Sequence, residues 1–332
     1  MSKILVTGGA GYIGSHTALA LIRAGYEVVV YDNLSTGKKE AVLPPARLEI
    51  GDLGDIERLD RLLRRERFRA IIHFAASIIV PESVTKPLKY YQNNTSKTIG
   101  LVDLAVKNCV PEFVFSSTAA VYGVPETVPV NESAPLDPIN PYGRSKLMNE
   151  WVLRDAHKAH PDFRYAILRY FNVAGADPEG RLGQETPNAT HLIKVACQAA
   201  LGQREVLPVY GTDYPTRDGT GERDYIHVSD LANVHVKALE YLEGGNQSRI
   251  FNCGYGHGYT VREIIEAVRE VSGKELNVKE MPRRPGDPAR LIADPSRLSA
   301  ETDWRPRLND IRRIVANALD WEKESAGRKE SH

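Results

Sequence analysis

Apolar and polar residues follow one another in blocks along the first half of the chain, and the blocks predict strands and helices in turn. Runs such as KILVTG at 3–8 and EVVVYD at 27–32 lack a two-residue alternation, which is typical of strands covered on both faces of a parallel sheet. Four further runs predict strands of the same kind: RLEIGD (47–52), AIIHFAA (70–76), EFVFSS (112–117) and RYAILRYFN (164–172).

Helical periodicity fills the gaps between these runs. The predicted helices cover 12–24, 56–65, 83–108 and a segment that begins after Pro141. Strands and helices that alternate in this way predict an α/β protein with a doubly wound parallel sheet, and ligands are expected at the carboxyl ends of the strands.

The rhythm loosens in the second half, where 173–190 and 211–224 are long polar stretches. Loops of that length inside a compact protein are usually functional or disordered. We therefore expect a nucleotide-binding domain at 1–172 and a smaller α/β substrate domain at 173–332. Parts of 225–252 are expected to pack back on the first domain.

Composition narrows the possible partners. Lys plus Arg and Asp plus Glu both number 43, so nothing suggests broad attraction to nucleic acid or to an anionic membrane. The three cysteines, Cys109, Cys197 and Cys253, are far apart and show no metal-ligand spacing, and the nine histidines form no HExxH motif. With no predicted signal peptide, membrane span, disulfide framework or metal, the expected location is cytoplasmic.

The stretch LVTGGAGYIGSH at 5–16 joins the first predicted strand to the first predicted helix. Its glycines fit GxGxxG with Gly9 as the first glycine, or GxxGxxG with Gly8, and both patterns continue through Gly11 and Gly14. Either pattern allows close approach of a pyrophosphate to the backbone, with the helix N–H groups around Tyr12 and Ile13 aimed at it. A tight turn without a ligand is the alternative, and the strand before and helix after the loop favour the dinucleotide.

Asp32 ends the second predicted strand, 18 residues after Gly14. A carboxylate there suits a ribose 2′-hydroxyl and repels a 2′-phosphate, so NAD is favoured over NADP, with Asn33 beside it. The next two strands end in GDL and FAA, where the adenine and the nicotinamide ribose are expected. The residues concerned are Asp52, Leu53, Phe74, Ala75 and Ala76.

The decapeptide PYGRSKLMNE at 141–150 places Tyr142 and Lys146 four residues apart, on one helix face. A free phenol has a pKa of about 10, so ionising it near pH 7 needs about 4 kcal/mol. Burial opposes ionisation, whereas one cation about 4 Å away contributes on the order of 4 kcal/mol at an effective dielectric of about 20. Lys146 together with the positive ring of NAD would therefore make Tyr142 a base. The preceding strand supplies the hydroxyls of Ser116, Ser117 and Thr118.

The chain resembles the extended short-chain dehydrogenase/reductase superfamily, which has a Rossmann fold, and within it the UDP-glucose 4-epimerase family. LVTGGAGYIGSH and FSSTAAVYG are typical of the superfamily, whereas YYQNN, LRYFN and DGTGERDYIHV are more specific to the epimerases. The resemblance extends over nearly the whole chain, through YDNLSTG, FAA, ESVTKPLKYYQNN, NPYGRSKLMNE, LRYFNVAGA, DYPTRDGTGERDYIHVSDLA and RRPGD.

This resemblance implies NAD-dependent epimerisation at C4 of a UDP-hexose, through a transient 4-keto sugar, in galactose metabolism. It implies that Tyr142 is the catalytic base, that Lys146 is its electrostatic partner and that Thr118 hydrogen-bonds the sugar 4-oxygen. It also implies a homodimer, paired through the outer faces of the helices at 83–108 and 142–158. Further residues that it implies for the cofactor and substrate sites are Asn93, Phe171, Asn172, His191, Leu192, Tyr210, Arg223, Arg284 and Asp287.

Several positions depart from the family pattern and leave the preferred sugar open. Ile78 lies in a run where the family has a lysine near the nicotinamide. In the expected uridine site, His191 replaces a frequent Asn and Lys194 a usual Pro. Leu291 aligns with a Tyr or Cys near the sugar C2 substituent. An N-acetylated UDP-hexosamine or a UDP-pentose is therefore an alternative substrate.

Other activities of the same superfamily are less consistent with the sequence. A sugar-nucleotide 4,6-dehydratase needs an acid–base pair directly after the strand hydroxyl, and here Thr118 is followed by Ala119 and Ala120. A dinucleotide sensor without activity would commonly lack the tyrosine or the lysine, and both are present. A net dehydrogenase stays open at this stage.

Overall fold

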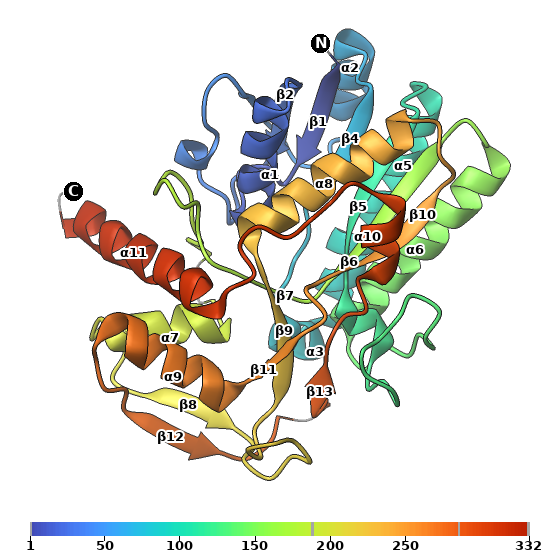
Figure 1. Ribbon diagram of the computed structural model, residues 1–332. Helices are drawn as coiled ribbons and strands as arrows, with labels where there is room; N and C mark the ends of the chain where they lie inside the picture. The colour runs from blue at the N-terminus through green and yellow to red at the C-terminus, as the bar shows by residue number, and fades with distance from the viewer. Residues whose placement is uncertain (1, 187–188, 285, 331–332) are drawn as a thin grey trace.

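A parallel sheet of seven strands forms the centre of the protein, of which the computed structural model describes residues 2–186, 189–284 and 286–330 (Figure 1). Every pairing in this sheet is parallel. The strand order reverses between β1 and β4, which is the switch point where doubly wound sheets bind ligands. The predicted doubly wound fold is thus confirmed. In spatial order the strands are β3 (Arg47–Ile50), β2 (Glu27–Asp32), β1 (Lys3–Thr7), β4 (Ala70–His73), β5 (Glu112–Thr118), β6 (Arg164–Tyr170) and β10 (Arg249–Cys253).

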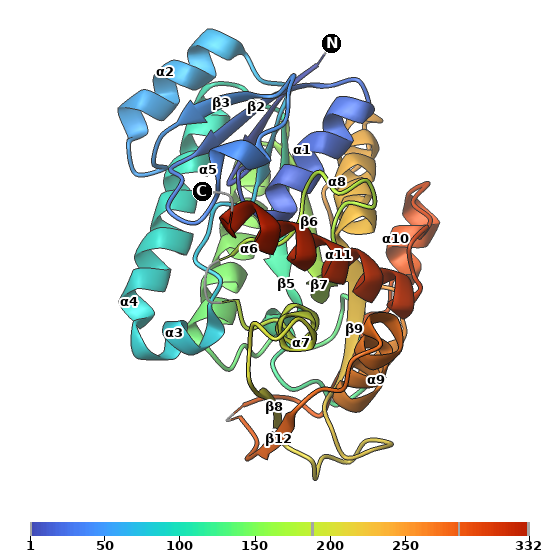
Figure 2. The ribbon, with the colours of Figure 1, turned by 90° about the vertical axis from the view of Figure 1, so that its left-hand side faces the viewer.

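Helices cover both faces of this sheet, as Figure 2 shows. Ile4 and Val6 of β1 pack into one apolar cluster and Leu5, between them, packs into the other, which explains the uninterrupted apolar runs. The first cluster lies under α1 (Tyr12–Arg23) and α8 (Val228–Glu243). The second lies under α2 (Ile56–Glu66), α5 (Lys97–Lys107) and α6 (Pro141–Ala159).

The single helix predicted over 83–108 is wrong, because this segment is divided into several pieces. Pro87 has no N–H to donate and restricts Lys86 before it, which leaves the helical region with φ −130° and ψ 57°. The chain then passes through a π-helical turn, a feature often found at functional sites. The pieces are α3 (Val80–Thr85), α4 (Pro87–Tyr90), η2 (Tyr91–Ser96) and α5.

The second half of the chain builds a smaller assembly at the carboxyl edge of the large sheet (Figure 1). Its helices α7 (Leu192–Ala200), α9 (Val261–Ser272) and α11 (Ile311–Glu330) pack on one another around an apolar cluster of their own. Its strands are β7 (Asn172–Ala174), β9 (Glu222–His227), β11 (Gly258–Thr260) and β13 (Arg290–Leu291) in one sheet, and β8 (Leu207–Tyr210) with β12 (Val278–Met281) in another.

Three short helical segments lie elsewhere along the described chain: η1 (Lys39–Ala41), η3 (Ala119–Tyr122) and α10 (Ser296–Glu301).

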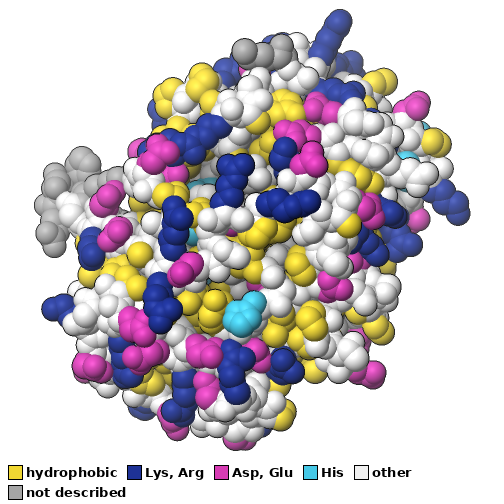
Figure 3. Space-filling model, viewed as in Figure 1, with side chains coloured by type: hydrophobic (Ala, Val, Ile, Leu, Met, Phe, Trp, Pro, Cys, Tyr) yellow, Lys and Arg dark blue, Asp and Glu magenta, His cyan; other side chains and the backbone are white. Residues whose placement is uncertain are grey.

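The chain crosses between the two assemblies more than once. After β9 it returns to the large sheet, where α8 packs on α1 and β10 pairs with β6 at the sheet edge. Acidic and basic side chains are interspersed over the face in Figure 3. Within the described ranges, none of the helices combines the length and the apolar character that a bilayer crossing needs.

Removing the side chain of Phe251 should test how firmly β10 belongs to the large sheet. Phe251 is fully buried in the cluster under α1 and α8. We expect Phe251→Ala to lower the free energy of unfolding by about 3–5 kcal/mol in urea titrations. Val124→Ala, at a position 60% exposed, is the control and should change it by less than about 0.5 kcal/mol. A loss below about 1 kcal/mol for Phe251→Ala would contradict this view of the edge strand.

Candidate active site

Helix α6 begins immediately before the predicted tyrosine, for reasons visible in the sequence. The Asn140 side chain caps the helix by accepting a hydrogen bond from the Gly143 nitrogen at 2.8 Å, and Pro141 occupies the first turn. A Cβ at Gly143 would lie 2.7 Å from the Ala120 carbonyl oxygen, so only glycine permits this approach. The first turn of α6 is thereby held against η3, directly after β5.

Lys146 lies one turn beyond Tyr142 and points at the end of β5. Its side chain is buried, and its Nζ donates to the Ser116 carbonyl oxygen at 2.8 Å and lies 5.0 Å from the centre of the Phe115 ring. Burial lowers the pKa of Lys146 to about 7, because the charged form loses its hydration. The group can therefore exist in both protonation states near neutral pH.

Tyr142 lies near Thr118, the last residue of β5, whose hydroxyl acts to lower the pKa of the phenol. The Thr118 oxygen accepts from the Ala120 nitrogen at 3.1 Å, which leaves its own proton free to donate to the phenol. Burial raises the pKa of Tyr142 to about 12, and the Thr118 hydrogen bond opposes this rise without reversing it. Desolvation raises the pKa of the phenol, and positive charge would lower it. In the protein without a cofactor, desolvation is the larger of the two effects.

The glycine loop lies where the switch point requires it. Gly11 is the residue before α1, and Gly14 is buried within the first turn. Gly8 has φ +72°, and a Cβ there would lie 2.6 Å from the Ala75 nitrogen, so the loop directly contacts the end of β4. Phe74 packs against His235 of α8 with ring centres 4.7 Å apart.

Asp32, the last residue of β2, also connects two loops through its side chain. One carboxylate oxygen accepts from the Ala10 nitrogen at 3.0 Å and the other from the Leu34 nitrogen at 2.8 Å. The carboxylate thus fixes the glycine loop against the loop that follows β2. Each oxygen keeps lone-pair capacity for a further donor such as a ribose hydroxyl.

Asp52, at the end of β3, is held by two neighbours. Asn33 donates to one oxygen at 2.8 Å, and Lys97 of α5 pairs with the other at 2.6 Å. Burial acts to raise the pKa of Asp52, but hydrogen bonds from Lys97, the Gly54 nitrogen and Asn33 outweigh it, and the net shift is downward. Leu53 beside it is buried in the cluster under α2.

Asn93 belongs to the π-helical turn and donates to the Ser77 hydroxyl at 3.1 Å. It therefore lies beside the loop that follows β4, which contains Ala76, where the sequence predicts the nicotinamide. Ile78, the departure from the family pattern, is 44% exposed. Phe171 is buried with Ala119 in a small cluster below η3.

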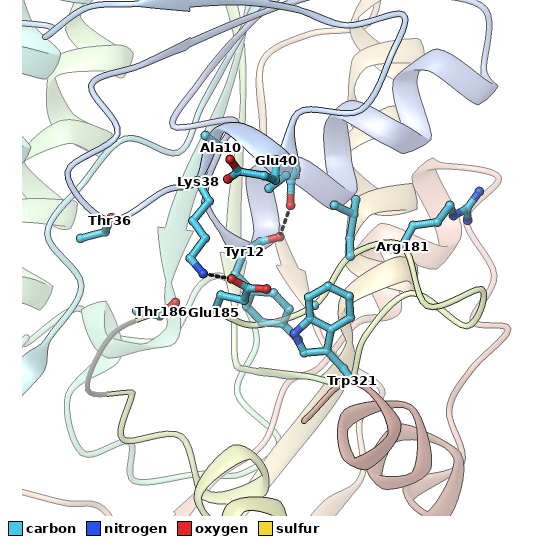
Figure 4. A pocket seen from close by; sticks show the side chains of 14 residues that line it. Ala10, Tyr12, Thr36, Lys38, Glu40, Arg181, Glu185, Thr186 and Trp321 are labelled. Atoms are coloured by element: carbon cyan, nitrogen blue, oxygen red, sulfur yellow. Dashed lines mark hydrogen bonds and ion pairs between the residues drawn. The ribbon is translucent and has the colours of Figure 1, made fainter. Parts of the chain in front are cut away.

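A pocket beside the glycine loop involves residues that the sequence patterns did not suggest (Figure 4). Lys38, from the loop after β2, forms an ion pair with Glu185, and the pair bridges the pocket next to Gly11. Trp321 of α11 lies at its other side. No motif marks Lys38 or Glu185, because their pairing joins segments that are far apart in the sequence.

The predicted arginines of the substrate site lie in different surroundings. Arg223 forms an ion pair with Asp287 and donates to the Pro288 carbonyl oxygen at 2.7 Å, so these two predicted residues contact each other. Arg284 is exposed and stacks on Tyr210, 3.8 Å from the ring centre. Among the described residues no ion pair of Arg284 is found, which leaves its guanidinium available to an anion.

The segment predicted to bind uridine lies at the start of α7 and is held by contacts with Gln184 and Glu322. His191 is the residue before the helix and contacts Gln184 at 2.8 Å, and Leu192 is its first residue. Lys194, where the family usually has proline, pairs with Glu322 of α11 and donates to the Gln184 carbonyl oxygen at 2.6 Å. The lysine therefore joins this loop to the C-terminal helix. Asn172 begins β7 and is half-buried.

Metal chemistry finds no support in the parts of the chain that the structure covers, where no cluster of three His, Cys, Asp or Glu side chains could hold an ion. The groups gathered at the switch point are a phenol, an amine and a hydroxyl beside a glycine loop. Together with the fold, they define a dinucleotide-binding protein of the extended short-chain dehydrogenase/reductase class.

Comparisons with known proteins identify the family. Residues 4–254 match the NAD dependent epimerase/dehydratase family, and the chain belongs to it. The UDP-glucose 4-epimerase of Azospirillum brasilense is 55% identical over 97% of this chain and 92% of its own. The structure of UDP-glucose 4-epimerase from Brucella ovis with NAD covers 96% of this chain and 98% of that one, with TM-score 0.93 and 44% identity. The UDP-Glc/GlcNAc 4-epimerase of Campylobacter jejuni covers 98% and 100%, with TM-score 0.87 and 51% identity.

Proposed function

We propose that the protein interconverts UDP-glucose and UDP-galactose by NAD-dependent epimerisation at C4. The observation that carries this proposal is the contact between Tyr142 and Thr118 at the end of β5, with Lys146 buried one turn away. Ala119 and Ala120 follow and offer no acid for elimination. The site therefore favours oxidation at C4 over dehydration.

The residues present fit NAD as the resident cofactor. A Cβ at Gly8 would lie 2.6 Å from the Ala75 nitrogen, so the loop can pack this closely only with a glycine there. The Asp32 carboxylate accepts from Ala10 in the same loop, where it disfavours a 2′-phosphate. Gly8, Gly11, Tyr12, Ile13 and Gly14 would hold the pyrophosphate at the start of helix α1. Bound NAD would supply a reversible hydride acceptor for C4 and positive charge near Tyr142.

Tyr142 removes the proton of the sugar 4-hydroxyl and later returns it, while the Thr118 hydroxyl orients the 4-oxygen. The shift that burial imposes on the phenol has to be offset by positive charge, and Lys146 supplies part of it when protonated. The 4-keto sugar then presents its other face before it is reduced. Arg223 and Arg284 hold the diphosphate through charge-assisted hydrogen bonds while the hexose turns, and Asp287 accepts from the ribose.

An N-acetylated UDP-hexose is the second candidate substrate. Leu291 packs against the small cluster that includes Ala119 and Phe171, next to the proposed hexose site. A leucine there is shorter than a tyrosine, and the added space suits a larger substituent at C2. The relative from Campylobacter jejuni, described as acting on UDP-Glc and UDP-GlcNAc, supports testing both sugars.

The activity is tested by incubating the purified protein with UDP-glucose and with UDP-N-acetylglucosamine and quantifying the products at equilibrium. We expect formation of the 4-epimer without net reduction of added NAD. Tyr142→Phe should reduce kcat by at least about a hundredfold, because the base is lost. Arg144→Lys, at an exposed neighbouring position, is the control. Full activity of Tyr142→Phe, or steady net NAD reduction by the wild type, would falsify the proposal.

Replacing Thr118 should change the pH dependence of the reaction in a defined direction. The base must be ionised, and the Thr118 hydrogen bond lowers the pKa of Tyr142, so its loss in Thr118→Val raises that pKa. A hydrogen bond to a charged group is worth about 1.5–3 kcal/mol, or roughly one to two pKa units. We expect the acidic limb of the kcat/KM profile to move up by that amount. Thr118→Ser keeps the hydroxyl, and a limb that moves equally in both variants would count against this role.

We also propose that two copies of the chain form a dimer through the helices α3 to α6. Large apolar side chains are exposed there, on four neighbouring helical pieces: Val84 (63%), Leu88 (71%), Ile99 (46%) and Trp151 (49%). Exposed apolar surface gathered in this way is typical of an interface.

The three cysteines are free, two of them buried, which suits a cytoplasmic protein of galactose metabolism.

A charge in place of Leu88, the most exposed of these apolar side chains, should separate the dimer. Leu88→Glu is expected to convert the wild-type dimer into a monomer in sedimentation velocity, because an unpaired carboxylate would be buried at the interface. Val124→Glu, at an exposed apolar position outside these helices, should leave the dimer intact. A monomeric wild type, or a dimer that survives Leu88→Glu, would show that the interface lies elsewhere or does not exist.

A further inference from the structure

A third contact joins α6 to β5, one turn beyond those made by Tyr142 and Lys146. Ser117 lies between the two β5 residues that these side chains contact, and its hydroxyl donates to the Glu150 carboxylate at 2.5 Å. Tyr142, Lys146 and Glu150 are spaced by four residues and share one face of the helix. Two successive residues of the strand, Ser116 and Ser117, are therefore bonded to Lys146 and Glu150, and the third, Thr118, lies near Tyr142.

The Glu150 carboxylate is also clamped by an arginine from the next strand. Arg169 of β6 lies opposite Ser117 in the sheet register, and its Nε and Nη2 donate to the two carboxylate oxygens at 2.9 and 2.5 Å. The side chains are 2% and 1% exposed, so the pair is isolated from solvent. A two-pronged contact of this kind fixes direction as well as distance.

The network continues from Arg169 toward the substrate side. Its Nη1 donates to the Tyr122 hydroxyl at 3.0 Å, and Tyr122 in turn donates to Asn252 of β10 at 2.7 Å. Asn252 holds the Val130 carbonyl oxygen at 2.8 Å, and the Val130 nitrogen donates to the carbonyl oxygen of Ile292. The proton-transfer helix is thus connected, through buried polar groups only, to the strand segment that carries Leu291.

We propose that Glu150 and Arg169 are positioning residues that hold Tyr142 at the reacting oxygen. Apolar side chains could fill the same space at lower desolvation cost, but they would allow the helix to rotate or slide. The charged clamp permits one register between α6 and β5, and in that register Tyr142 meets Thr118 and Lys146 meets the end of the strand. This inference rests on the proposed function, because it concerns the proton transfer at C4.

Glu150→Gln tests the proposal, since it keeps the shape of the side chain and removes its charge. We expect kcat for the UDP-sugar to fall by about ten- to a hundredfold, with KM changed by less than about threefold, because a misplaced base slows chemistry and not binding. With a substrate deuterated at C4, the isotope effect on kcat should rise, since hydride transfer coupled to proton removal becomes slower than product release. A merely structural role would lower the folded fraction and leave the isotope effect unchanged.

Glu112→Gln is the matched control. Glu112 is the first residue of β5, at the opposite end of the strand from the site. It is fully buried and pairs with Arg69 and Arg164 at 2.6 and 2.9 Å. We expect its kcat and isotope effect to match the wild type. Should Glu150→Gln fail to fold, Ser117→Ala decides, with an expected loss of about three- to tenfold in kcat on the scale of one lost hydrogen bond.

The possible failures are distinguishable. A wild-type protein without epimerisation overturns the proposed function, and the positioning role with it. An active wild type whose Glu150→Gln or Ser117→Ala variant keeps kcat within about twofold, with an unchanged isotope effect, overturns the positioning role alone. Equal losses in Glu112→Gln and Glu150→Gln would also overturn it, because the effect would then not depend on the place of the charge.

Discussion

Desolvation of two ionisable groups at the contact between α6 and β5 is the constraint on which the site depends. Burial moves the pKa of Tyr142 up to about 12 and that of Lys146 down to about 7, so each group is driven toward its neutral form. A neutral phenol beside a neutral amine is a poor base. In the proposed mechanism the phenol becomes a base only when further positive charge enters the site, so proton transfer would depend on the cofactor that accepts the hydride.

The surrounding scaffold limits movement at this contact from several directions. The Asn140 cap and the close approach at Gly143 fix where the helix begins, and the charged clamp behind it fixes its rotation. Breaking a buried ion pair by removing one partner costs about 3–5 kcal/mol. Glu150 with Arg169, and Lys194 with Glu322 under the predicted uridine segment, are two such pairs, and each resists the loss of either partner.

Much of this organisation could be predicted from the sequence, because it depends on local patterns. Uninterrupted apolar runs predicted the parallel strands, and the loop ending at Gly14 and the helix beginning before Tyr142 were found by their motifs. The break in the helix at Pro87 was missed although the proline is visible, since the apolar spacing continues across it. Pairings between distant segments, such as Lys38 with Glu185, have no sequence signal. Glu150 does have a sequence signal, because it follows Lys146 by four residues. Its contact with Arg169 on β6, which suggests its role, is visible only in the structure.

The return of the chain through α8 and β10 has a consequence for biosynthesis. Residues 1–172 alone would leave β6 as an unpaired sheet edge and α1 without the helix that covers it, because β10 and α8 come later in the chain and end at residue 253. Unpaired edges of this kind invite pairing with other chains. During synthesis the new chain therefore passes through an interval in which this edge is exposed, although the finished structure covers it.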